Sequence, residues 1–182
     1  TGGMSSGKGT RVKVLLRQIP AHRGMIYWNG EQVGDPKTFF IPPRCAYTGQ
    51  VPRLFSESLK DNILLGLSEE ECDIEQAISL ALLSKDVFEM DTGLETLVGP
   101  RGIRLSGGQL QRSAAARMFV RDAELLVFDD LSSALDVETE RQLWEGVFAG
   151  RDDHSAPTCL VVSHRRPAFR RADHIVVLKD GR

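Results

Sequence analysis

Glycines and a lysine are closely spaced at the start of the chain, which reads TGGMSSGKGT. Glycine lets a backbone turn so that several N–H groups point at one phosphate, and a lysine adds a mobile positive charge. The spacing is that of a phosphate-binding loop, followed by a helix whose positive end faces the anion. Taken alone, the segment also fits a flexible Gly/Ser tail. The residues predicted to hold a nucleotide here are Gly2, Gly3, Met4, Ser5, Ser6, Gly7, Lys8, Gly9 and Thr10.

Two carboxylates follow the apolar segment ELLVFDD at residues 124–130. A phosphate-binding loop needs a carboxylate at the end of a neighbouring strand to hold Mg²⁺ or its waters, and Asp129 fits that role. Asp130 is placed to polarise an attacking water, and His164, after the apolar segment CLVVS, to hydrogen-bond the γ-phosphate. These residues predict ATP and Mg²⁺ as cofactors.

The elements that position these residues alternate along the chain. Residues 10–19 predict a helix with Val12, Leu15, Leu16 and Ile19 on its core face, and residues 24–30 a strand running into an Asn29-Gly30 turn. Further helices are expected at 109–120 and 137–148, and strands at 124–130, 158–164 and 174–181. Apolar strands separated by helices predict an α/β fold, a parallel sheet covered on both faces, with ligands at the carboxyl ends of its strands.

A second region, between the Pro-rich loop at 41–52 and residue 108, is predicted to be helical. Ser56 is expected to cap one helix, and Asp73 to cap another in which Ile74, Ala77, Ile78 and Ala81 recur at helical spacing.

The stretch Leu105-Ser106-Gly107-Gly108-Gln109 is an ordinary helix start in isolation. Between a phosphate-binding loop and an Asp-ended strand, however, it resembles the signature of ATP-binding cassette (ABC) ATPases. Gln50 resembles that family's Q-loop glutamine, residues 133–136 (SALD) its D-loop, and His164 its switch histidine. The six motifs occur in the family's order over nearly the whole chain.

The resemblance implies a P-loop NTPase (RecA-like) parallel sheet core with an inserted α-helical subdomain. The core would comprise residues 1–50 and 109–182, and the helical signature subdomain residues 51–108. The family's leading strands precede its phosphate-binding loop, so they are expected to be missing before Thr1.

The resemblance also implies roles and partners. Gln50 would meet the Mg²⁺ ion, with Asp129 and Thr10 as the other metal ligands, and would take part in catalysis with Asp130 and His164. A second cassette, identical or different, would complete a dimer with two sandwiched nucleotides. A transmembrane domain in the same or a separate chain would place the cassette at the cytoplasmic face of a membrane, and LETLVGPRGIRLSGGQ is similar to export-type transporters. The second phosphate site, facing the partner's ATP, would comprise Ser106, Gly107, Gly108 and Gln109.

Two of the departures from the family's pattern bear on hydrolysis and on the metal. Asp130 stands where most members have a catalytic glutamate, and Gly9 stands where a serine or threonine hydroxyl is usual. The first departure predicts slow hydrolysis, because a misplacement of ~1 Å can cost on the order of 100-fold in rate. A degenerate cassette that binds nucleotide and scarcely hydrolyses it is therefore an alternative. A nucleoside monophosphate kinase is a second, because such kinases also contain GKGT.

Composition narrows the remaining possibilities. The 182 residues carry a net charge of −2 and three scattered cysteines, so neither a nucleic-acid partner nor a disulfide or zinc framework is expected. The apolar runs are strand-sized, and no membrane span is expected. We expect the arginines of HRRPAFRR, from Arg165 to Arg171, to lie on a solvated surface. Tyr27 and Trp28 are expected to pack in the core or against the sheet.

Overall fold

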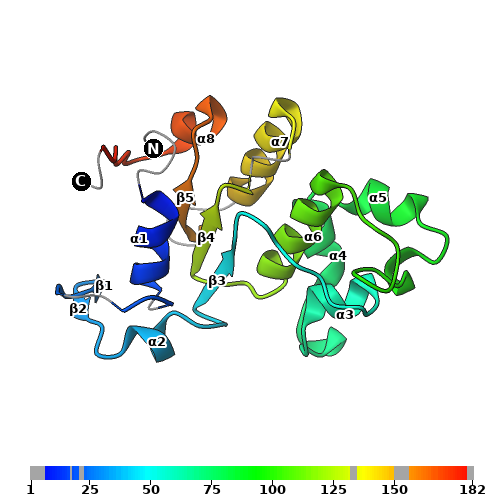
Figure 1. Cartoon of the computed structure of the whole chain (residues 1–182), viewed down its shortest axis with the longest axis horizontal. Coiled ribbons are helices and arrows are strands. Elements are labelled where there is room, and N and C mark those ends of the chain that lie inside the picture. Colours follow the sequence, from blue (N-terminus) through cyan, green and yellow to red (C-terminus); the bar gives the residue numbers. More distant parts are fainter. Residues whose placement is uncertain (1–6, 17, 21–22, 132–134, 150–155, 180–182) are drawn as a thin grey trace.

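A parallel sheet is the centre of the computed structural model, which describes residues 7–16, 18–20, 23–131, 135–149 and 156–179. Three strands form it in the order β3 (Cys45–Thr48), β4 (Leu125–Asp129) and β5 (Thr158–Val162), and both pairings are parallel (Figure 1). Every residue of β4 is buried, as expected for a central strand with both faces covered. The predicted parallel α/β sheet is confirmed.

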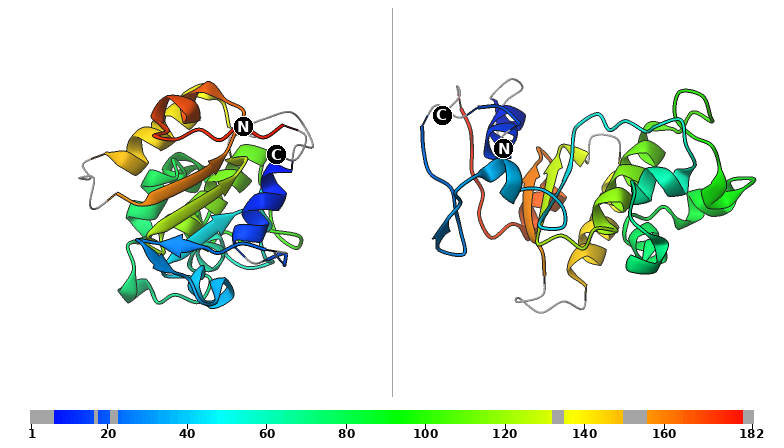
Figure 2. Two further views of the ribbon diagram at one scale, coloured as in Figure 1. Left: turned by 90° about the vertical axis from the view of Figure 1, so that its left-hand side faces the viewer. Right: turned by 90° about the horizontal axis from the view of Figure 1, so that it is seen from below.

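Alternate residues of the strands supply two separate cores. Leu125 and Val127 pack with Val12 of α1 (Lys8–Leu15) and with its C-cap residue Leu16, whereas Leu126 and Phe128 belong to the larger cluster on the other face. That cluster includes residues of α6 (Gly107–Phe119) and α7 (Val137–Phe148). Figures 1 and 2 accordingly show α1 on one face of the sheet and α6 and α7 on the other.

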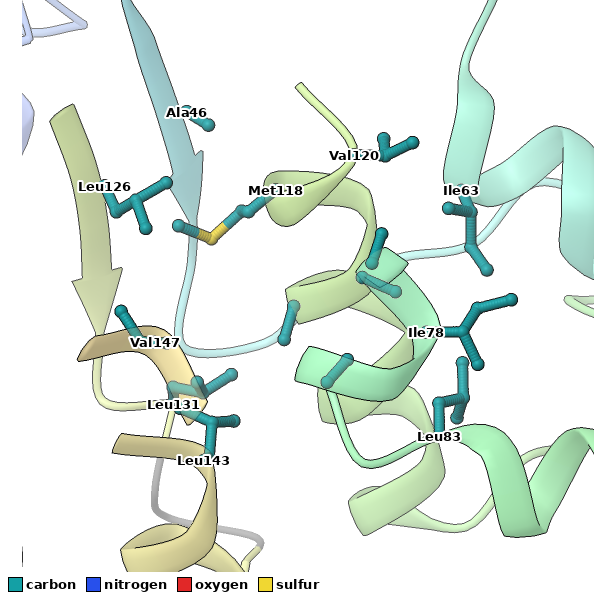
Figure 3. Packing of buried hydrophobic residues seen from close by; sticks show 14 of the residues in the cluster. Ala46, Ile63, Ile78, Leu83, Met118, Val120, Leu126, Leu131, Leu143 and Val147 are labelled. Atoms are coloured by element: carbon teal, nitrogen blue, oxygen red, sulfur yellow. The ribbon is translucent and has the colours of Figure 1, made fainter. Parts of the chain in front are cut away.

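A helical region lies between β3 and α6 in the sequence. It contains α3 (Leu59–Leu64), α4 (Ile74–Leu80) and α5 (Ser84–Glu89), with short 3₁₀ turns at Glu69–Glu71 and Gly93–Glu95. Figure 3 shows α6 between this region and the sheet, with Met118 directed toward the strands and Ile63 and Ile78 on the helical side. Because α6 packs against both parts, the division of the chain at residue 108 stays a prediction.

The two predicted helix caps have different outcomes. Asp73 caps α4 as expected, since its carboxylate accepts the Gln76 N–H over 2.8 Å. The prediction for Ser56 is wrong, because Ser58 is the cap of α3. The Ser58 hydroxyl oxygen accepts the Asp61 N–H over 2.9 Å, the ordinary N-cap geometry, and the helix starts at Leu59.

The predicted turn at Asn29-Gly30 joins a short antiparallel hairpin of β1 (Tyr27–Trp28) and β2 (Glu31–Gln32). Both turn residues have positive φ, 49° and 84°, as a two-residue hairpin loop requires. Trp28 packs edge-on against Phe39 and Phe40, at and just after the end of α2 (Pro36–Phe39). Tyr27 is 56% exposed, so the packing predicted for the pair holds only for Trp28.

Two sequence predictions at the ends are wrong. Residues 174–181 were expected to form a strand, but no described residue of this segment is in one; Val176 and Val177 are 68% and 64% exposed. A strand needs a neighbour to accept its backbone hydrogen bonds, and no described strand pairs with this segment. The helix predicted over residues 10–19 ends at Leu15 instead. Leu15 and Ile19, which were expected on its core face, are therefore exposed. The last helix, α8, spans Arg166–Arg171.

A conservative substitution tests the packing of the helical region. Ile63→Val removes one methylene from a side chain that is 1% exposed, so we expect the free energy of unfolding to fall by about 0.5–1.5 kcal/mol. The matched control is Ile175→Val, because Ile175 is 53% exposed and loses little burial. Urea denaturation of both variants measures the difference, and equal stabilities would contradict the packing described here.

Candidate functional site

The described part of the phosphate-binding loop begins at Gly7, the N-cap of α1. Gly7 has φ 78°, a left-handed conformation that glycine adopts without strain, and its carbonyl accepts the Arg11 N–H over 3.0 Å. The N–H groups of a helix's first turn have no acceptor within the helix itself, so the start of α1 carries a partial positive charge, which suits an anion. The predicted residues Gly2, Gly3, Met4, Ser5 and Ser6 lie outside the described residues.

Gly9 brings the start of α1 against the end of β4. A Cβ atom at Gly9 would lie 2.8 Å from Oδ2 of Asp129 and 3.2 Å from its Oδ1, so the carboxylate sits directly against the glycine backbone. Thr10, the next residue of α1, is exposed. The backbone of Gly9 therefore lies directly beside the predicted metal carboxylate.

Asp129 is 9% exposed, and its burial raises the pKa of its carboxyl group above the usual value. The charge of Lys13 opposes this shift, that of Asp130 adds to it, and a hydrogen bond from Tyr47 lowers the pKa again. A partly desolvated carboxylate with few protein partners is well suited to a divalent cation, whose charge would offset the cost of burial.

Asp130, Gln50 and His164 converge at the carboxyl edge of the sheet. Gln50 Nε2 donates to Asp130 Oδ2 over 3.3 Å, and His164 Nδ1 lies 3.5 Å from Asp130 Oδ1. Asp130 itself has φ 59°, and its N–H donates to the Val162 carbonyl over 3.0 Å. Oδ1 is buried and accepts no hydrogen bond from the described residues, so it is available to a water or a protonated His164. Asp130 and His164 were predicted from their places after two strands, and Gln50 from the family resemblance; the structure brings the three together.

A buried glutamine that the sequence analysis did not single out holds Gln50 in place. Gln111 is 3% exposed, and its Nε2 donates to the Gln50 backbone carbonyl over 2.9 Å. Because Gln111 belongs to α6, the contact joins the signature helix to the loop after β3. A polar residue on the buried face of a helix was the available signal in the sequence.

The start of α6 is fixed by its own side chains and by α5. Ser106 and Gln109 form a reciprocal capping box: the Ser106 hydroxyl oxygen accepts the Gln109 N–H over 3.2 Å, and Gln109 Oε1 accepts the Ser106 N–H over 2.9 Å. Gln109 Nε2 also donates to Asp86, which is paired with Arg112 at 2.9 Å. Ser106 and Gly107 are exposed, whereas the Gln109 carboxamide is engaged in holding the helix start.

Arg165, next to His164, reaches across to the segment before α7. Its Nη1 donates to the Leu135 carbonyl over 2.6 Å and lies 3.6 Å from Oε2 of Glu140, a carboxylate only 1% exposed. Arg165 is therefore held by the fold, so the solvated surface predicted for its arginine run does not extend to it. Asp136 caps α7 by accepting the Glu138 and Thr139 N–H groups, while Ser133 and Ala134 lie outside the described residues.

The donor set near Asp129 fits a nucleotide-bound Mg²⁺ ion. Such ions are held by one or two carboxylates with the remaining positions filled by phosphates and water. Asp129 is buried beside the start of α1, where the phosphates would lie. Within the described residues no group of three or more His, Cys, Asp or Glu side chains is arranged to hold a metal by itself.

Comparison with known proteins gives consistent results. A family model described as ABC transporter matches residues 1–133. P-glycoprotein 14 of Caenorhabditis elegans is 35% identical over 182 residues, covering 100% of this chain and 14% of that protein. A probable multidrug resistance ABC transporter ATP-binding/permease protein of Bacillus subtilis is 36% identical over 181 residues, 99% of this chain and 30% of that protein. An ATP-dependent lipid A-core flippase of Cupriavidus pinatubonensis is 37% identical over 188 residues, 100% of this chain and 31% of that protein.

The solved structures agree. A bacterial Atm1-family ABC exporter with ATP bound superposes with a TM-score of 0.86 at 29% identity, covering 99% of this chain and 31% of that one. The chain thus spans a third or less of the length of these relatives. The match over residues 1–133, the shared fold and the order of the motifs lead to one assignment: the chain is an ATP-binding cassette that belongs to the ABC transporter family.

Proposed function

We propose that this cassette binds MgATP at the carboxyl edge of its sheet and hydrolyses it to power an export-type transporter. The observation that carries the proposal is the convergence of Asp130, Gln50 and His164 beside the contact between Gly9 and Asp129. Family membership supports an ATPase coupled to transport.

Each residue has a distinct role in this proposal. The loop from Gly2 to Thr10 holds the phosphates, with Lys8 as the mobile cation. Asp129, with Gln50 and Thr10 or a water, holds Mg²⁺, which neutralises charge that develops on the phosphates. Asp130 accepts a proton from the attacking water, and His164 donates a hydrogen bond to the γ-phosphate. ATP hydrolysis depends mainly on such positioning, so small displacements of Asp130 matter.

A second cassette is proposed to complete the site. α1 and α6 pack on opposite faces of the sheet (Figure 1), so their starts do not face one another across a single nucleotide in this proposal. The start of α6 would instead face the ATP of a partner cassette. This helix start has the exposed residues Ser106 and Gly107, followed by Gly108 and the capping Gln109. The partner is either identical or different.

A membrane-spanning permease is the other proposed partner. The Bacillus relative is named as both ATP-binding and permease protein. None of the helices that the structure describes here has the length and apolar content to cross a bilayer. Val51 and Phe55, just after Gln50, are 77% and 60% exposed, and Asn62 holds Phe55 in place by bonds to its N–H and carbonyl of 2.7 and 3.1 Å. This loop would contact the permease at the cytoplasmic face of the membrane; no nucleic-acid partner is proposed.

The test uses the native protein together with its permease, purified and reconstituted in vesicles. We expect Mg²⁺-dependent phosphate release from ATP and no formation of ADP from AMP, which a nucleoside monophosphate kinase would give. Nucleotide binding without phosphate release would favour the degenerate cassette, for which Asp130 and Gly9 are the supporting observations. Absence of ATP binding would contradict the proposal outright.

A further inference from the structure

A buried carboxylate on α7 has its opposite charge outside that helix. Glu140 is 1% exposed, and its Oε1 accepts the Trp144 Nε1–H over 3.4 Å. Its Oε2 is buried and accepts no hydrogen bond from the described residues, and Arg165 Nη1 lies 3.6 Å from it. Because burying a carboxylate is costly unless a cation accompanies it, the fold favours Arg165 in this place.

Arg165 is anchored through both its backbone and its side chain. Its N–H donates to Ser163 Oγ over 3.0 Å, and Ser163 is buried directly after β5. Its Nη1 donates to the carbonyl of Leu135, in the segment before α7, over 2.6 Å. With the ion pair to Glu140, these contacts tie the loop after β5 to α7 and to the residues that precede it.

His164 stands between the two anchored residues with an exposed side chain. Its imidazole is 63% exposed, and its Nδ1 lies 3.5 Å from Asp130 Oδ1. A contact this long and this exposed does little to fix a side chain. The place of the imidazole beside Asp130 therefore depends on the backbone at His164, which Ser163 and Arg165 hold on either side.

A second ion pair joins the same two parts of the fold at the surface. Helix α8 follows Arg165 and packs against α7 (Figure 1), and Arg171 Nη2 lies 3.8 Å from Glu145 Oε1. The side chains of Arg171 and Glu145 are 46% and 42% exposed, and pairs so exposed contribute little. The chain thus offers two bridges to α7, one buried next to His164 and one at the surface.

We propose that Arg165 is a positioning residue for His164: through Leu135 and Glu140 it fixes the loop after β5 against α7, and so keeps the imidazole beside Asp130. A shift of this loop would move His164 without touching the phosphate-binding loop. The inference rests on the proposed function, because His164 meets the γ-phosphate only there.

The test measures phosphate release by the native protein reconstituted with its permease. Arg165→Met combined with Glu140→Gln removes both charges together, so neither is left buried and unpaired. We expect kcat to fall ~10-fold with KM for ATP unchanged, since ~1 Å of misplacement can cost on the order of 100-fold in rate. The matched control is Arg171→Met with Glu145→Gln, which removes the surface pair and should keep the native kcat.

A His164→Ala background separates positioning from general stability. With radiolabelled ATP, so that slow release is measurable, Arg165→Met with Glu140→Gln should change kcat there by less than about 2-fold, because no imidazole is left to position. An equal fall in both backgrounds, a native kcat in the combined variant, or the same fall in the control overturns the role of Arg165. Phosphate release by His164→Ala at the native rate would instead overturn the proposed role of His164.

Arg165→Lys is a second variant that keeps the buried charge paired. The lysine ammonium can stay near Glu140, but it lacks the rigid fork with which the guanidinium meets both the Leu135 carbonyl and Glu140. This variant should melt at the native temperature and still have a lower kcat. A native kcat in Arg165→Lys would show that a positive charge alone suffices and would overturn the positioning by Arg165.

Discussion

Asp130→Asn is expected to lower ATP hydrolysis by a factor of about 10² to 10⁴, the range typical for loss of a general base. Asparagine keeps the size of the side chain and tolerates the left-handed backbone, φ 59°, that Asp130 adopts. The amide cannot accept a proton from the attacking water, although it can still contact Gln50. ATP binding should therefore be preserved while phosphate release is lost. Phosphate release and the affinity for a fluorescent ATP analogue, both measured on the full-length protein, report the two effects separately.

Asp122→Asn provides a matched control for that variant. Asp122 is also a left-handed aspartate, with φ 43°, but it is exposed and lies in the turn before β4, away from the carboxyl edge of the sheet. Its substitution should leave hydrolysis unchanged. A rate for Asp130→Asn equal to that of the control would remove Asp130 from the mechanism.

The parts of the fold that the sequence predicted well are those in which local pattern and tertiary burial agree. The apolar run of residues 125–128, followed by Asp129, forms a fully buried strand, and the helix predicted at 137–148 has those same bounds. The segment at 174–181 has an equally apolar pattern but forms no strand over its described residues. Strand formation depends on a neighbour in space, and the pattern of a segment carries no information about that neighbour.

In the candidate site too, some residues could be predicted from the sequence and others depend on contacts between distant segments. Asp130 and His164 were predicted to lie close together because the carboxyl ends of parallel strands meet at one edge of a sheet, and the family resemblance added Gln50; the three converge in the structure. The residues that hold them could not be found this way. Gln111 acts through a contact with the Gln50 carbonyl, 61 positions away in the sequence, and the spacing of the motifs carries no information about such a contact.

Asp130→Glu is expected to accelerate hydrolysis. Both contacts of the Asp130 carboxylate are long, 3.3 Å to Gln50 Nε2 and 3.5 Å to His164 Nδ1, so the carboxylate is set back from the groups around it. One further methylene extends it by about 1.5 Å. Since ~1 Å of misplacement can cost on the order of 100-fold, recovery of a large part of that factor is expected. Steady-state ATPase rates of the full-length protein measure it.

A glutamate also carries a cost at this position, and the sizes of the two effects decide the outcome. The left-handed backbone disfavours residues other than glycine, asparagine and aspartate by roughly 1–2 kcal/mol, which lowers stability. This cost is paid by the folded enzyme in both its ground and transition states, so it leaves the barrier to hydrolysis unaffected, whereas the gain in reach lowers that barrier. Asp122→Glu, which imposes the same backbone cost at an exposed site, should melt earlier without changing the rate. An unchanged or slower rate in Asp130→Glu would mean that the aspartate carboxylate is already within reach of the attacking water. Asp130 would then no longer explain the slow hydrolysis predicted for this cassette.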